Sequence, residues 1–161
     1  MRHQRRLPST VSISPSKLST PGSQSSDIVR TRAPGRINLI GEHVDYQGGV
    51  VMPAAINRYT KAVAQANGRS ELRLSSSQGH EDLVVPIEHR MPFSGDNSWA
   101  NYAFGVVAKY RDAGYPVGGF DVRFESNLPL GAGLSSSAAL ETATALVIEA
   151  LLGLDLPQTE R

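Results

Sequence analysis

Residues 128–141 read LPLGAGLSSSAALE, a glycine-rich turn that runs directly into a helix. Residues 120–124 before the turn alternate between apolar and polar side chains and predict a strand, whereas residues 138–152 behind it are rich in Ala, Leu, Val and Ile and predict a helix. Glycines allow a backbone to approach a ligand closely, and the free N–H groups at a helix start attract anions. The segment therefore has the features of a phosphate site, and a plain serine cap after a turn is the structural alternative.

Two widespread phosphate-binding motifs do not fit this segment. A P-loop of the form G-x-x-x-x-G-K-[ST] needs a lysine after its second glycine, and none of the three lysines of the chain lies there. A dinucleotide-binding fingerprint, G-x-G-x-x-G, begins correctly with Gly131 and Gly133 but has Ser136 in place of its third glycine. A different phosphate loop is therefore needed to explain the pattern.

Composition limits the class of protein. A length of 161 residues suits one domain, and no apolar run approaches the roughly 18 residues that a membrane span requires. Cysteine is absent, which excludes disulfides and thiolate metal sites and fits a cytoplasmic location.

Residues 1–26 hold four of the 16 basic and none of the 15 acidic side chains. Their Ser, Thr, Pro and Arg content predicts a disordered tail before a globular body at residues 27–161. The body carries no basic surface suited to nucleic acid.

A second informative segment, residues 35–49, reads GRINLIGEHVDYQGG. It gathers a guanidinium at Arg36, two carboxylates at Glu42 and Asp45, and an imidazole at His43. Sugar recognition needs such donors and acceptors, because every hydroxyl group both donates and accepts. The alternatives are a solvated loop with a surface ion pair, and a metal site on the last three residues, although close neighbours in sequence rarely point at one centre.

Both segments resemble one family. Residues 33–46, APGRINLIGEHVDY, are similar to the signature of the galactokinases, and residues 129–138 match P-x-x-x-G-L-x-S-S-A, the phosphate loop of the GHMP small-molecule kinases to which they belong. The resemblance implies an α+β fold of the GHMP-kinase N-terminal type, with a ribosomal-protein-like pair of layers and a left-handed crossover. It also implies transfer of the γ-phosphate of ATP to the 1-hydroxyl of D-galactose.

The resemblance implies a role for each matching residue. Arg36 would lie beside the transferred phosphoryl group, and Glu42, His43 and Asp45 would bind the galactose ring. The ATP phosphates would be held by Gly131, Gly133, Ser135, Ser136 and Ser137, with Ser137 also a ligand of Mg²⁺. Trp99, in a W-A-N-Y segment, has two candidate roles, stacking on adenine or packing in the core. A non-catalytic galactose and ATP sensor, or a kinase for N-acetylgalactosamine or arabinose, is an alternative function.

The remaining elements follow from local patterns. A first strand is expected at 28–32 and would end at Ala33-Pro34-Gly35. Strands at 59–65 and 71–75 are expected to pair around the turn Asn67-Gly68, and a further strand is expected at 82–87. A helix is expected at 98–110. Residues 155–160 resemble a helix start with no helix behind it. We therefore expect the chain to be the N-terminal part of a longer kinase whose catalytic aspartate lies beyond it, with little turnover of its own and a tendency to aggregate through open edges and apolar faces.

Overall fold

The computed structural model describes residues 27–41, 48–78, 81–129 and 131–157. The strands are β1 (Val29–Ile40), β2 (Met52–Ala66), β3 (Glu71–Ser76), β4 (Leu83–Pro86) and β5 (Phe120–Ser126), and the α-helices are α1 (Ala100–Asp112) and α2 (Ser136–Leu152). A short 3-10 helix, Gly95–Asn97, precedes α1. The expected α+β class is confirmed. No helix in these described ranges is long and apolar enough to cross a membrane.

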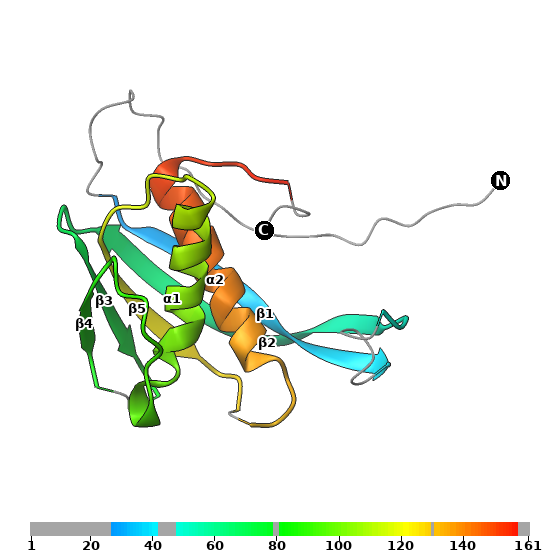
Figure 1. The fold of residues 1–161 in the computed structure, drawn as a ribbon. Coiled ribbons are helices and arrows are strands. Elements are labelled where there is room, and N and C mark those ends of the chain that lie inside the picture. Colours follow the sequence, from blue (N-terminus) through cyan, green and yellow to red (C-terminus); the bar gives the residue numbers. More distant parts are fainter. Residues whose placement is uncertain (1–26, 42–47, 79–80, 130, 158–161) are drawn as a thin grey trace.

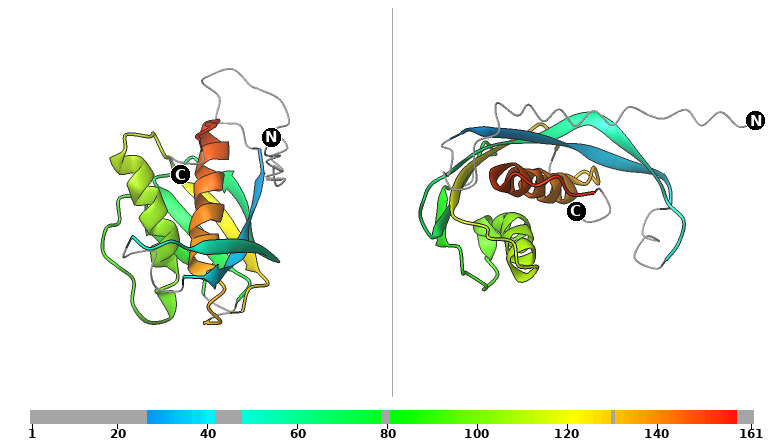
Figure 2. Two further views of the ribbon diagram at one scale, coloured as in Figure 1. Left: turned by 90° about the vertical axis from the view of Figure 1, so that its right-hand side faces the viewer. Right: turned by 90° about the horizontal axis from the view of Figure 1, so that it is seen from above.

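The strands form one sheet with the order β1-β2-β5-β3-β4, in which only β3 and β5 run parallel. The sheet curves around both helices, which pack side by side on its concave face (Figure 2). Alternate residues of β3 and β5 point toward the helices because side chains in a strand alternate between its two faces. The largest buried side chains there include Leu72, Leu74, Phe120, Val107 and Ile148. The left-handed crossover stays a prediction.

The expected pairing of β2 with β3 is wrong. The Asn67-Gly68 turn is present, but β5 lies between the two strands that it connects. The chain enters this space at Gly119, whose N–H donates to Arg69 O at 3.1 Å and whose carbonyl accepts from Asn67 N at 3.1 Å. A side chain at Gly119 would collide with the backbone of the turn, so glycine is needed for β5 to pass between the two strands.

The expected end of the first strand at Ala33-Pro34-Gly35 is also wrong. β1 continues through these residues to Ile40, with a shift of register between Pro34, which faces Tyr59, and Arg36, which faces Ala55. Because β1 is an edge strand with a local irregularity, it tolerates a proline that would interrupt a central strand. The end of β1 and the start of β2 consequently extend as an arm beyond the helices (Figure 1).

Both helices lie close to their expected bounds. α1 ends at Asp112, two residues later than expected, and is followed by Gly114 with a φ of 90°. α2 begins at Ser136, two residues earlier than expected, ends at Leu152 and is capped by Gly153 with a φ of 66°. The two helices start at the same end of the molecule, where the glycine-rich turn lies (Figure 1). The predicted tail, residues 1–26, lies outside the described residues.

Candidate phosphate and sugar site

The glycine-rich turn has an unusual backbone immediately before α2. Gly131 and Gly133 both have a φ of 69°. Ser135 has φ 57° and ψ 43°, and among the described residues it is the only non-glycine residue with a positive φ. A left-handed conformation costs an L-amino acid roughly 1–2 kcal/mol. Such strain is concentrated at functional sites, where the surrounding structure holds it in place.

The start of α2 leaves its hydrogen-bond donors directed at this turn. Ser135 occupies the cap position but makes no side-chain capping bond, although its carbonyl accepts from Ala139 N at 3.0 Å. The amides of the first helical turn have no partner within the helix, and they carry the positive end of its dipole. Ser136 and Ser137, in the same turn, are half-buried residues. The structure therefore gathers five of the residues expected to hold phosphates.

A main-chain bond joins this turn to the strand that carries Arg36. The N–H of Arg36 donates to the carbonyl of Leu134 at 3.1 Å. Gly35 is buried at the same contact, where an added Cβ would lie 2.8 Å from Leu134 O and would also collide with the side chain of Leu128. Arg36 itself is exposed to solvent. The two segments singled out by the sequence, 100 residues apart, are thus brought together at Arg36.

The structure also reveals supporting residues that the sequence patterns did not single out. Tyr59 N donates to the side chain of Asn127 at 2.7 Å, and Leu128 N donates to the hydroxyl of Ser126 at 3.2 Å. Gln78 reaches across from the turn between β3 and β4 to donate to Leu128 O at 3.4 Å. These residues fix the base of the turn, and Asn127 and Gln78 could be identified only from the structure because their partners lie far away in sequence.

An open hollow lies against the base of the turn. Its volume is about 520 Å³, and it is lined by Arg58, Ser126, Asn127, Leu128, Pro129 and Leu134. Arg58 lies in the part of β2 that is displaced by the register shift opposite Gly35. Neither the hollow nor Arg58 was expected from the sequence.

Trp99 immediately precedes α1, at the end of the molecule where the glycine-rich turn lies. Its ring is half-buried and meets Phe124 edge to face, with centroids 6.3 Å apart and planes at 81°. This contact supports the core role. The adenine-stacking role stays a prediction.

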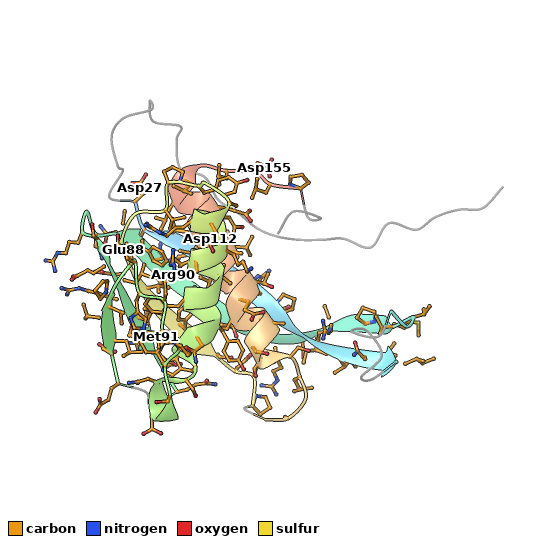
Figure 3. The ribbon with its side chains drawn as sticks, in the orientation of Figure 1. Asp27, Glu88, Arg90, Met91, Asp112 and Asp155 are labelled. Atoms are coloured by element: carbon orange, nitrogen blue, oxygen red, sulfur yellow. The ribbon has the colours of Figure 1, made fainter. Side chains whose placement is uncertain are left out.

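The three expected sugar ligands, Glu42, His43 and Asp45, lie outside the described residues. Within the described ranges, no cluster of three or more His, Asp or Glu side chains suits a metal ion. The charged residues labelled in Figure 3 include Asp112, the last residue of α1, and Glu88 and Arg90, which are found beside α1; none of the three is at the glycine-rich turn. Arg90 pairs with Asp112 at 3.6 Å, and Glu88 pairs with Arg111 at 3.7 Å, so these groups form surface ion pairs.

One titratable group of α2 lies near the turn. Partial burial raises the pKa of the Glu141 carboxyl above its ordinary value. Glu141 follows Ser137 by four residues, so the two side chains share one side of the helix.

Two family models match the chain. Residues 21–71 match the galactokinase galactose-binding signature, and residues 101–161 match the GHMP kinase N-terminal domain. The galactokinase of Thermotoga maritima is 40% identical over 132 residues, which cover 82% of this chain and 36% of that protein. The galactokinase of Fusobacterium nucleatum is 40% identical over 136 residues, with 82% of this chain and 34% of that protein covered. The chain thus spans about a third of the length of these curated relatives.

Solved structures agree with these matches. A Lactococcus lactis galactokinase complexed with galactose has a TM-score of 0.73 and 34% sequence identity, covering 83% of this chain and 35% of that chain. A mevalonate kinase of Methanococcus jannaschii has a TM-score of 0.68 at 20% identity, covering 88% of this chain and 44% of that chain, and shows the likeness of fold alone. The signature matches, the shared fold and the joined motifs agree: the chain belongs to the galactokinase family of the GHMP kinases and corresponds to its N-terminal part.

Proposed function

We propose that this chain provides the ATP-phosphate and galactose-binding part of a galactokinase. In the whole protein, the oxygen of the galactose 1-hydroxyl would bond to the γ-phosphorus of ATP while the bond from that phosphorus to ADP breaks and the hydroxyl loses its proton. The products are galactose 1-phosphate and ADP. The observation that carries the proposal is the 3.1 Å bond from Arg36 N to Leu134 O, because it joins the strand of the galactose signature to the glycine-rich turn.

The start of α2 is the proposed phosphate site. Gly131 and Gly133 are exposed, with room around their Cα atoms, and the uncapped amides of the first turn are the donors that anionic oxygens need. Phosphoryl transfer requires positioning and charge stabilisation more than covalent chemistry from the protein. Arg36 is exposed and its backbone is bonded to this turn, so we assign its guanidinium to stabilise charge on the transferred group.

Mg²⁺ accompanies the nucleotide in this proposal. The hydroxyl of Ser137, in the first turn of α2, is the ligand that we assign to it. A single protein hydroxyl is a reasonable contribution, because Mg²⁺ keeps several waters and is commonly held by nucleotide phosphates and few protein groups. Bound there, the ion would neutralise phosphate charge.

Sugar recognition is assigned to Glu42, His43 and Asp45. These residues lie within the matched galactose-binding signature, and they follow β1 shortly after it passes the glycine-rich turn. Trp99 is the proposed contact for adenine, supported by its place at the end of the molecule where α2 begins. We place the reaction in the cytoplasm, in keeping with a sequence that contains no cysteine.

Calorimetry on the 161-residue chain tests the proposal. We expect Mg·ATP and D-galactose each to bind, D-glucose to bind more weakly than galactose, and Glu42→Gln to weaken galactose binding without changing ATP binding. Binding of neither ligand, or equal binding of both sugars, would contradict the assignment. A parallel assay of galactose-dependent ADP release then measures how much turnover the chain supports by itself.

A further inference from the structure

The glycine-rich turn leaves the sheet at Asn127, one residue beyond the end of β5. The N–H of Asn127 donates to Tyr59 O at 3.2 Å, and the N–H of Tyr59 donates to the side-chain Oδ1 of Asn127 at 2.7 Å. In a regular antiparallel ladder, both bonds of such a pair go to backbone carbonyls. The side-chain oxygen of Asn127 therefore replaces the backbone carbonyl of Asn127 as the acceptor for the N–H of Tyr59. The backbone can then turn away from the sheet without leaving that N–H unpaired.

Neighbouring contacts also fix the position at which the turn leaves β5. Ser126 Oγ lies 3.1 Å from Thr60 Oγ1 and accepts from Leu128 N at 3.2 Å, while the side chain of Leu128 is 1% exposed. The far side of the turn is held by the bond from Arg36 N to Leu134 O. Between these anchors, Gly131, Ala132 and Gly133 are exposed and make no hydrogen bond with other described residues. The path of the turn is consequently set by where its two ends are fixed.

We propose that Asn127 is a positioning residue for the phosphate site, because its side chain fixes the point at which the glycine-rich turn leaves β5 and thereby aims the amides of the turn and of the first turn of α2. Asn127 acts through Tyr59 and need not touch a ligand. The consequence for nucleotide affinity rests on the proposed function of the turn. The role of Asn127 in fixing the path of the turn is independent of that function.

A second asparagine provides a matched control. Asn67 lies at the opposite end of the β2–β5 pair, where its Nδ2 donates to Asp121 Oδ1 at 2.8 Å and to Glu71 O at 3.1 Å, and its Oδ1 accepts from Arg69 N at 2.9 Å. Asn67→Ala makes the same chemical change as Asn127→Ala and removes three side-chain hydrogen bonds, against the one that Asn127 accepts from Tyr59. It does so away from the glycine-rich turn.

The experiment compares both alanine variants of the full chain by amide hydrogen exchange without ligand and by calorimetry with Mg·ATP. Loss of one hydrogen bond of this kind is expected to speed exchange of the two bonded amides that anchor the turn, those of Arg36 and Leu128, by about three- to tenfold in Asn127→Ala, and to raise the Kd for Mg·ATP by a similar factor. Asn67→Ala should leave both quantities unchanged while lowering the thermal unfolding temperature. Asn127→Asp keeps an acceptor for the N–H of Tyr59 and should restore slow exchange of the Arg36 and Leu128 amides.

Three outcomes overturn the proposal: no change at the Arg36 and Leu128 amides in Asn127→Ala, an equal change there in Asn67→Ala, or fast exchange there in Asn127→Asp as well. If Asn127→Ala does not fold, Asn127→Ser, whose side chain is shorter, takes its place under the same criteria. If the turn responds to Asn127→Ala but the unaltered chain binds no Mg·ATP, the positioning role stands and the nucleotide function fails.

Discussion

At the scale of single residues, Gly35 determines how closely β1 can approach the glycine-rich turn. It is buried between Leu128, Leu134 and Ile56, and no other residue type fits without moving them. The sequence pattern located this glycine within the galactose signature but gave no reason for it. The reason is steric and comes from a segment almost 100 residues later.

Gly35→Ala is expected to destabilise the chain. The added Cβ would lie 2.8 Å from the carbonyl oxygen of Leu134, so the backbone must shift, at a typical cost of about 1–3 kcal/mol. Gly105→Ala is the control, because Gly105 lies within α1 with no atom within 4 Å of an added Cβ. The control should raise the free energy of unfolding by up to about 1 kcal/mol. Urea denaturation measures both, and equal effects of the two substitutions would contradict the steric account.

Glu141 gives α2 a dependence on pH. Its folded-state pKa is raised by burial, so the folded state holds the proton more tightly than the unfolded state does, for which the ordinary value is 4.5. The associated stability is fully present below pH 4.5 and is lost as the pH rises through the folded pKa. Because much of the side chain remains in water, we expect Glu141→Gln to gain only about 0.5 kcal/mol or less relative to the unaltered chain between pH 4 and pH 7. Thermal unfolding across this range tests the sign, and a relative gain toward acid pH would contradict it.

At the scale of elements, helix bounds were predictable and strand partners were not. The glycines after α1 and α2 mark local backbone conformations that a sequence pattern can locate. The pairing of β3 with β5 depends instead on Gly119 fitting against the turn at Asn67, a contact between segments about 50 residues apart. The same limit applies to the site: the motifs identified the phosphate turn, whereas Asn127 and Gln78 became evident only from their distant partners.

The packing of α1 on α2 includes a buried carboxylate. Glu149 is 2% exposed and accepts from the hydroxyl of Tyr110 at 2.8 Å. Tyr110→Phe should lower the free energy of unfolding by about 1–3 kcal/mol, because a buried acceptor loses a donor. Tyr115→Phe is a matched control, since the ring of Tyr115 packs on Tyr110 at 5.5 Å and the described residues give its hydroxyl no hydrogen bond. Similar losses for both variants in chemical denaturation would show that the hydrogen bond is not responsible.

At the scale of the whole molecule, the arm formed by β1 and β2 exposes apolar side chains. Leu39 is 57% exposed, Ile40 67%, Val50 91% and Met52 51%. Contiguous apolar surface of this kind favours association. We expect the chain to self-associate at micromolar concentrations, and the double variant Ile40→Lys with Val50→Lys to shift it toward monomer in sedimentation velocity. Val84→Lys, on β4 with 54% exposure, is the control and should have little effect. A monomeric unaltered chain would contradict this expectation.

The bond between Arg36 and Leu134 has an energetic consequence for the complete site. If the chain binds both ligands as proposed, a nucleotide that draws the glycine-rich turn toward its phosphates would also pull on the backbone of β1 through this bond, and a sugar bound beyond β1 would pull on the turn in return. Thermodynamic linkage requires the two effects to be equal, so galactose should change the affinity for ATP by the same factor by which ATP changes the affinity for galactose. Titrating each ligand with and without the other measures this cooperativity, and a factor of one in both directions would mean that the shared backbone bond transmits nothing.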